Sequence, residues 1–202
     1  MKDFAKNYAI FSSLIGGGAS GGNTGGDSED SSTLRALIEG TLSGNYVNDR
    51  VTSIGEHAFT GCKSLASANL PGVTDIGESA FEYCTNLTNV NLPEATGIGD
   101  YAFKDCTSLT TVDFPLVNTI GYYAFRGCTN LTALILRNTK AICKLTNPTM
   151  GPFAETPIES GTGYIYVPSA LIEDYKAASS WSAHANQFRA IEDYPEICGG
   201  DN

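Results

Sequence analysis

Several features that would point to a particular chemistry are missing from this chain of 202 residues. No apolar run approaches the roughly 20 residues that a membrane-spanning helix requires, so we expect no membrane span. Basic residues number 12 against 22 acidic ones, and the net charge of −10 opposes binding to nucleic acid. The G-x-S-x-G string at residues 18–22 lies within a Gly/Ser-rich stretch and is no nucleophile elbow, and the lysine of a phosphate-binding loop is missing. The sequence therefore predicts a protein without an active site or a cofactor.

A repeat with a constant period of 22 residues fills the middle of the chain, from Val51 to Arg137. A fixed period of this size is typical of a solenoid, in which equivalent side chains stack from coil to coil. The period is seen in four columns of identical residues: Ile54, Ile76, Ile98 and Ile120; Phe59, Phe81, Phe103 and Phe125; Cys62, Cys84, Cys106 and Cys128; Leu65, Leu87, Leu109 and Leu131.

The cysteines of the repeat are expected to be buried, reduced packing groups, because a free thiol in a core behaves as a small apolar side chain. Cys143 and Cys198 lie outside the repeat and are free to pair with each other. The two histidines give no support for a metal site. His57 occupies a variable position of the repeat that we expect at the surface, and His184 has no second ligand at suitable spacing.

Each repeat divides into a strand and a return segment. The pattern Leu-x-x-(Ala/Val/Leu)-x-(Leu/Phe), closed by Pro71, Pro93 and Pro115, predicts a strand. Alternation along these strands sends one set of side chains into the core: Ala68, Val90, Val112 and Leu134, with Leu70, Leu92, Phe114 and Leu136. The pattern Ile-Gly-x-x-Ala-Phe-x-x-Cys predicts a turn followed by a short helix.

The repeat continues in altered form after Arg137. A fifth coil is expected from Thr139, with Ile142 again 22 residues after Ile120 and with Phe153 delayed by a loop around residues 147–150. A last strand is predicted at residues 164–167. Ser169 is expected to cap a helix whose apolar face is Leu171, Ile172, Tyr175 and Ala178, and a second helical face is formed by Trp181, Ala185 and Phe188.

These residues resemble a known family. The phrase I-G-x-x-A-F-x-x-C-x-x-L-x-x-(V/L)-x-(L/F)-P is similar to the BspA-like leucine-rich repeat, also called the Treponema pallidum type, over residues 51–137. The resemblance implies a leucine-rich repeat solenoid of the α/β class, right-handed and curved, with parallel strands on its concave face. It also implies extracellular binding or adhesion, since such repeats occur in bacterial surface antigens and in phage structural proteins.

The chain is predicted to have five parts: an N-terminal anchor segment (1–15), a Gly/Ser-rich linker (16–32), an N-terminal cap (33–50), the solenoid (51–168) and a C-terminal helical cap (169–202). The linker composition is too poor in apolar residues to fold alone. Ser32 is expected to cap a short helix over residues 33–39. The anchor is an apolar stripe at helical spacing: Phe4, Tyr8, Phe11, Leu14 and Ile15.

Two surfaces are candidates for binding. Short polar side chains are expected to point outward from the concave strands, in columns made of Ser67, Asn69, Asn89, Asn91, Thr111 and Asp113 and continued by Ala133 and Ile135. Such columns are also what a merely solvated strand face would show. The second candidate is an aromatic patch of Tyr101, Tyr122, Tyr123, Tyr164 and Tyr166, because tyrosine adds contact area at small entropic cost.

The first hypothesis for function is a non-enzymatic virion component of a phage or prophage, in a tail, fibre or head decoration. Residues 1–15 would bind other virion proteins, and the solenoid would bind a host-surface glycan or protein; a homo-oligomer is also compatible. This setting rests on a resemblance of residues 37–55 and 165–191 to repeat proteins of phages and prophages. The alternatives are a secreted bacterial surface adhesin, at the cell surface or in the extracellular space, and an intracellular scaffold.

Overall fold

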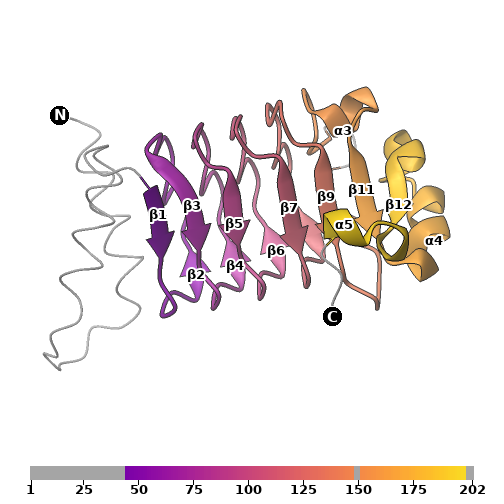
Figure 1. The fold of residues 1–202 in the computed structure, drawn as a ribbon, viewed down its shortest axis with the longest axis horizontal. Helices are drawn as coiled ribbons and strands as arrows, with labels where there is room; N and C mark the ends of the chain where they lie inside the picture. The colour runs from indigo at the N-terminus through magenta and orange to yellow at the C-terminus, as the bar shows by residue number, and fades with distance from the viewer. Residues whose placement is uncertain (1–43, 148–150, 199–202) are drawn as a thin grey trace, which may run out of the picture.

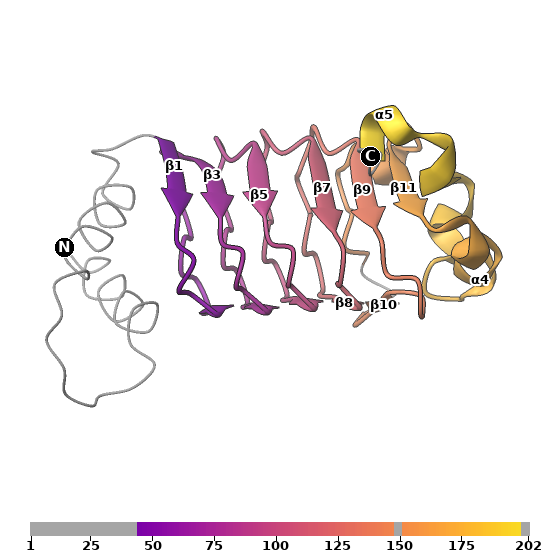
Figure 2. The same cartoon turned by 60° about the horizontal axis from the view of Figure 1, so that its bottom comes forward.

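The computed structural model describes residues 44–147 and 151–198, which form a stack of coils followed by a helical segment (Figure 1). Each of the first five coils contributes one strand to the front of the stack and one two-residue strand to its back (Figures 1 and 2). The front strands are β1 (Gly44–Val47), β3 (Leu65–Asn69), β5 (Asn89–Asn91), β7 (Thr111–Phe114), β9 (Ala133–Leu136), β11 (Tyr164–Val167) and β12 (Phe188–Ala190). The back strands are β2 (Ser53–Ile54), β4 (Asp75–Ile76), β6 (Gly97–Ile98), β8 (Thr119–Ile120) and β10 (Lys144–Leu145).

All paired strands run parallel, as the repeat predicted. The back strands form one continuous sheet in the order β10-β8-β6-β4-β2. The front strands form two sheets, β1-β3-β5 and β12-β11-β9-β7. The register follows the period of the sequence, so that Ala68 lies opposite Val90 and Val112 opposite Leu134. The expected alternation is confirmed, because the residues predicted to point inward are all buried.

A column of phenylalanines runs through the centre of the stack. The rings of Phe59, Phe81, Phe103 and Phe125 are parallel to within 6°, with centroids 5.0, 5.2 and 5.4 Å apart, and each residue is 0% exposed. Phe153 extends the column, with its ring 5.9 Å from that of Phe125. Burying a side chain of this size contributes about 2 to 3 kcal/mol, so this column is a main source of the stability of the stack.

The cysteine column is confirmed as buried free thiols. Three of these thiols, those of Cys84, Cys106 and Cys128, donate to the phenylalanine carbonyl of the preceding coil; the Sγ of Cys84, for example, lies 3.0 Å from the Phe59 oxygen. Burial raises the pKa of Cys62 and of Cys128 to about 12. Cys143 is also a free and fully buried thiol. The side chain of Cys198, with which it was expected to be free to pair, lies outside what the structure describes.

The return segment contains turns rather than the predicted short helix. Its main chain bonds to the next coil, as in Phe59 N to Ala80 O at 2.7 Å and Phe81 N to Ala102 O at 2.7 Å. A helix would have used these groups internally, so stacking of the coils wins over the local helical preference. The prediction that the alanine and phenylalanine of the segment fill the coil is confirmed.

The fifth coil begins later than the sequence predicted. Leu145, not Ile142, pairs with Ile120 in the back sheet. Leu145 lies 25 residues after Ile120, and Phe153 lies 28 after Phe125, because each section of this coil is lengthened. Ile142 instead packs at the edge of the core, half-buried. The predicted loop falls partly on residues 148–150, which lie outside the described residues.

The chain then forms a series of short elements around the last coil: α3 (Pro157–Ser160), η1 (Ser169–Leu171), α4 (Ile172–Ala177), η2 (Ser182–Gln187), η3 (Ile191–Asp193) and α5 (Pro195–Cys198). The strand at 164–167 is confirmed as β11, and the predicted face of α4 packs on the core through Leu171, Ile172, Tyr175 and Ala178. Cys143 connects this segment to the fifth coil. Its N donates to the Tyr175 hydroxyl at 2.8 Å, and its O accepts from the Trp181 ring at 2.7 Å.

Two local predictions for this segment were wrong. Ser169 makes no side-chain cap, because its N and Oγ donate to the Glu192 carboxylate at 3.1 and 3.2 Å. Phe188 does not lie on a helix; it begins β12, which pairs with β11 and adds a further strand to the front. The predicted anchor, linker and helix over 33–39 lie outside the described residues. None of the helices in the described part of the chain is long and apolar enough to span a membrane.

Candidate binding surfaces

The structure places the six predicted polar residues together on the front of the stack, on β3, β5 and β7. Their registers align coil by coil, with Ser67 opposite Asn89 and Asn69 opposite Asn91. Hydrogen bonds run along the columns, from Ser67 Oγ to Asn45 Oδ1 at 2.7 Å and from Asn91 Nδ2 to Asn69 Oδ1 at 2.7 Å. This face therefore presents rows of short amides and hydroxyls, which we call the polar face: Ser67, Asn69, Asn89, Asn91, Thr111 and Asp113.

Asp113 ends the polar face with an ion pair. Its carboxylate accepts from Nε and Nη2 of Arg137 at 2.9 and 2.7 Å, in a two-pronged geometry. Both side chains are partly exposed, at 38% and 27%. A pair at such exposure contributes little to stability, but it removes the isolated negative charge from this end of the face.

The columns do not continue beyond β7 as the sequence predicted. Ala133 and Ile135, expected to point outward into solvent, are 5% and 2% exposed. They form a second small core with Tyr166, against which Tyr164, Ile191 and Tyr194 pack. Figure 1 shows the cause, since α5 crosses in front of β9 and β11. The residues that cover Ala133 and Ile135 lie more than 50 positions later in the sequence. The alternation within a single strand therefore could not predict this burial.

The predicted aromatic patch is divided between two places. Tyr101, Tyr122 and Tyr123 meet on the return turns, with ring centroids 5.0, 6.0 and 4.0 Å apart. Tyr164 and Tyr166 lie on β11 instead, and Tyr166 is only 2% exposed because Tyr194 packs on it at 5.4 Å. The structure thus keeps the first three tyrosines as an accessible group and removes Tyr166 from the surface.

Sequence reasoning missed three members of the first group. Tyr83 is 43% exposed, and the Lys104 ammonium lies 4.7 Å from the centre of its ring. Arg126 lies 4.9 Å from the centre of Tyr123. The spacing of the return segment could have placed them, because Tyr83, Lys104 and Arg126 occupy neighbouring positions of successive repeats. We call this surface the tyrosine ridge: Tyr83, Tyr101, Tyr122 and Tyr123 with Lys104 and Arg126.

Each of the two cations of the ridge is paired with a carboxylate. Lys104 contacts Glu82 at 2.7 Å, and Arg126 contacts Glu155 at 2.9 Å. Loss of solvation and a hydrogen bond with Tyr101 raise the pKa of Tyr122, and a hydrogen bond with Tyr122 raises the pKa of Tyr123. The hydroxyls of Tyr122 and Tyr123 therefore stay protonated near neutral pH.

The backbone of the ridge is strained. Tyr83, Tyr101 and Tyr123 have φ of 61°, 57° and 50°, in the left-handed region where side chains cost about 1 to 3 kcal/mol each. Glycine takes the position of Tyr83 in two other coils, as Gly61 and Gly127. His57, which shares the position of Tyr101, is exposed as expected and also has positive φ. Core packing does not require tyrosine at these positions.

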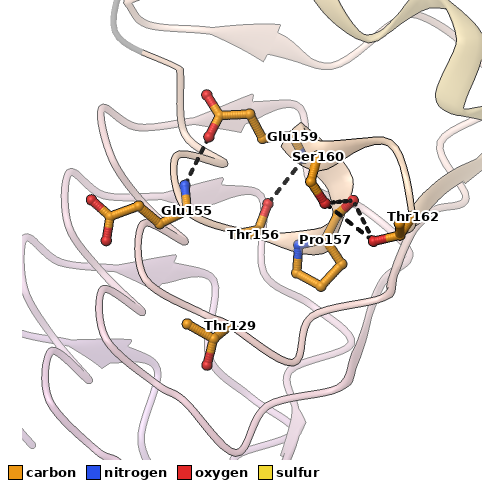
Figure 3. A pocket seen from close by; sticks show the side chains of 7 residues that line it. All are labelled: Thr129, Glu155, Thr156, Pro157, Glu159, Ser160 and Thr162. Atoms are coloured by element: carbon orange, nitrogen blue, oxygen red, sulfur yellow. Dashed lines mark hydrogen bonds between the residues drawn. The ribbon is translucent and has the colours of Figure 1, made fainter.

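A shallow depression of roughly 470 Å³ lies beside α3, lined by hydroxyls and two carboxylates (Figure 3). Its polar groups serve the helix. Thr156 Oγ1 accepts from Glu159 N at 3.2 Å, while Glu159 Oε2 accepts from Glu155 N at 2.8 Å. This reciprocal arrangement is a variant of the capping box, so it accounts for the two side chains without a ligand.

The match to a family of known proteins covers the stack. A model of the BspA type leucine rich repeat region matches residues 41–146 in six copies. This chain belongs to the BspA-type leucine-rich repeat family. The matched region extends beyond the repeat of residues 51–137 at both ends, and it includes β1 and the fifth-coil strand β10. Leucine-rich repeat proteins of this kind typically bind partners rather than catalyse reactions.

Two solved leucine-rich repeat proteins are similar to the chain. A leucine-rich repeat protein from Bacteroides ovatus is 26% identical, with a TM-score of 0.53, and the match covers 74% of this chain and 36% of that one. The T. pallidum leucine-rich repeat protein is 27% identical, with a TM-score of 0.48, over 61% of this chain and 57% of that one. The chain thus spans between about a third and three fifths of these proteins. No curated protein matches it.

Groups of three or more metal-ligating side chains are absent from residues 44–147 and 151–198. His184 is 7% exposed, packs edge-on against Phe153 at 5.3 Å, and its Nδ1 has no hydrogen-bond partner. Burial lowers the pKa of His184, and the charge of Glu159 opposes this effect only in part. The residue is a packing group of the C-terminal segment.

Proposed function

We propose that this chain is a non-enzymatic adhesion module whose polar face binds a glycan or a protein on the surface of a host. One observation carries the proposal. The chain covers the front of its stack at β9 and β11 with its own C-terminal segment, but it leaves the polar face on β3, β5 and β7 open to solvent. Family membership supports this reading, since BspA-type repeats are binding modules.

The tyrosine ridge is a second contact surface in this proposal. Tyrosine and arginine are enriched at the energetically important positions of protein interfaces. Here, turn positions that carry glycine, serine, histidine or aspartate in other coils carry Tyr83, Tyr101 and Tyr123 in the coils of the ridge. The φ is positive in all of these coils, so the repeat sets this backbone conformation and does not require tyrosine. The large side chains at these positions therefore support a contact surface.

We propose a virion as the setting, with the chain in a tail, fibre or head decoration. In that arrangement residues 1–15 bind other virion proteins, residues 16–32 act as a tether, and residues 33–50 and 169–202 cap the two ends of a curved solenoid. The resemblance of residues 37–55 and 165–191 to phage repeat proteins supports this setting. The family match favours a second candidate, a secreted bacterial surface adhesin of the BspA type.

The binding proposal is tested with the full-length chain, labelled with a fluorophore and applied to a glycan array and to immobilised extracellular-matrix proteins. Asn91→Ala on the polar face and Tyr122→Ala on the ridge separate the two surfaces. We expect binding that at least one of these exposed substitutions weakens about tenfold, while Glu94→Ala, an exposed position away from both surfaces, leaves it unchanged. Binding that neither variant alters would contradict both proposed surfaces.

The setting is tested by mass spectrometry of the mature N-terminus. An intact end, or one that has lost only Met1, excludes export through a cleaved signal peptide and supports the virion. Cleavage near residues 18–20 would count against a virion protein assembled in the cytoplasm and would favour the secreted adhesin.

A further inference from the structure

The front of the stack is interrupted between the second and third full coils. β5 is the last strand of one front sheet and β7 the first strand of the other, although the back sheet runs without a break through β4, β6 and β8 of the same coils. The two strands are neighbours in the stack (Figure 1). We call this interruption the seam: Thr88, Asn89 and Asn91 on one side, Thr110 and Thr111 on the other.

Main-chain bonds that repeat in the other coils are missing at the seam. Thr88 N donates to Ala66 O at 2.9 Å, and Thr132 N donates to Thr110 O at 2.9 Å. The corresponding bond from Thr110 N to Thr88 O is not formed. In residues 44–147, no backbone hydrogen bond joins β5 to β7. At the seam, these main-chain donors and acceptors have no partner among the described residues. In the other neighbouring pairs of front strands, the corresponding groups bond to each other.

Side-chain bonds are interrupted at the same place. Thr88 Oγ1 donates to Ala66 O at 3.0 Å and Thr132 Oγ1 to Thr110 O at 3.3 Å, but Thr110 Oγ1 does not reach Thr88 O. The side-chain bonds along the polar face are interrupted in the same way. Ser67 is bonded to Asn45, and Asn91 is bonded to Asn69. In contrast, Asn89 and Thr111 have no side-chain hydrogen bond in the described structure. All four residues at the open end of the seam are exposed: Thr88, Asn89, Thr110 and Thr111.

One residue of the repeat differs in the coil that carries β7. Phe114 stands where the other coils have Leu70, Leu92 and Leu136. Its ring is fully buried and contacts Phe103 and Phe125, with centroids 6.2 and 6.4 Å away. These contacts lie within its own coil and toward the following one, on the side where β7 keeps its pairing with β9.

We propose that the seam is a binding site for a neutral glycan, an inference that rests on the adhesion module proposed above. Free donors and free acceptors lie within a few residues of one another, and sugar hydroxyls both donate and accept. Backbone polar groups without a partner favour such a ligand strongly, because their bonds are otherwise supplied only by water. The net charge of −10 opposes sulfated or sialylated chains.

An added peptide strand is a poorer occupant of the same site. Strand addition needs a free sheet edge, and β5 is only three residues long with β7 standing beside it. The acidic charge of Asp113 is already neutralised by Arg137 at 2.7 Å, so the site offers hydrogen bonds rather than a charge. These features select a small, uncharged and hydroxyl-rich ligand.

The test uses the full-length chain on an array that carries neutral, sialylated and sulfated glycans, followed by titration of the strongest neutral glycan. The double variant Asn89→Ala/Thr111→Val removes the free side chains of the seam. The matched control Thr74→Val/Thr96→Val removes two hydrogen-bonded hydroxyls beside the back strands, away from the polar face. We expect at least about a tenfold loss of affinity in the first and less than about twofold in the second, since two to three hydrogen bonds are lost at the site.

A second measurement tests the seam without a ligand. Hydrogen exchange of the Thr110 amide is expected to be faster than that of the Thr88 and Thr132 amides, because only the latter two donate to the preceding coil. Equal protection of the three amides overturns the seam itself. Equal losses in the two double variants, or binding of sulfated glycans only, overturn the site or its ligand class. Binding to a protein without any glycan binding also overturns the inference, but leaves the adhesion module intact.

Discussion

Replacing Gly99 with alanine tests how closely the coils stack. A Cβ at this position would lie 2.7 Å from the carbonyl carbon of Gly77 and 2.8 Å from Glu78 N, both of them main-chain atoms of the preceding coil. Neither atom can rotate away, so the two coils must separate. Overpacking of this kind costs about 1 to 3 kcal/mol, and the lower chain entropy of alanine in the unfolded state recovers less than about 1 kcal/mol. We expect a net loss of about 2 kcal/mol.

Gly97→Ala is the matched control. This glycine lies two residues earlier in the same coil, and its added Cβ would meet only the Thr119 hydroxyl, at 3.1 Å, which a side-chain rotation can relieve. We expect a change of less than about 1 kcal/mol. For a domain of this size, a loss of about 2 kcal/mol lowers the melting temperature by roughly 4 to 8 °C.

The assay is thermal and urea unfolding of the two variants and the parent, followed by far-ultraviolet circular dichroism and by fluorescence of the single tryptophan, Trp181, which is fully buried. The two signals report the stack and the C-terminal segment separately, so they also show whether the chain unfolds in one step. If Gly99→Ala melts within about 1 °C of Gly97→Ala, the coils do not approach as closely as the structure shows and the reasoning is refuted.

Three further predictions concern the core. Phe103→Ala removes the middle ring of a fully buried column and is expected to cost about 3 to 5 kcal/mol in urea unfolding; a loss below about 1 kcal/mol would show that the column does not support the stack. The thiols of the cysteine column are expected to resist a disulfide reagent at about pH 8 until the protein unfolds, because burial raises the pKa of Cys62 and Cys128 to about 12; rapid labelling of the native chain would contradict their burial. Burial lowers the pKa of His184 below its ordinary value of 6.5, so the unfolded chain binds the proton more readily. The stability linked to His184 is present above about pH 6.5 and is lost as the pH falls through the lowered pKa. Urea unfolding at about pH 7.5 and 5.5 should show a smaller loss on acidification in His184→Phe than in the parent, and equal losses would refute the assignment.

The periodic part of the fold was predictable from the sequence because it depends on identical contacts. Ile54, Phe59 and Cys62 recur every 22 residues, and identical side chains at a constant spacing can all be buried only if the coils stack in register. The parallel strands, the buried columns and the inward alternation follow from that condition, and the structure shows all three. The polar face was predictable for the same reason, since it is the other side of the same alternation.

The exceptions to the period were decided by tertiary contacts. The return segment gives up a local helix because its main chain bonds to the next coil, and Leu145 replaces Ile142 because pairing with β8 outweighs sequence spacing. The cover over Ala133 and Ile135 comes from residues 191–194, which only the folded chain brings to β9.

The repeat thus determined the stack, because one set of side-chain contacts is written into the sequence again and again. Where the surface is open, covered or interrupted was decided only in the folded structure. Those features depend on which neighbouring strands hydrogen-bond to each other in the stack, and on where a distant segment comes to lie.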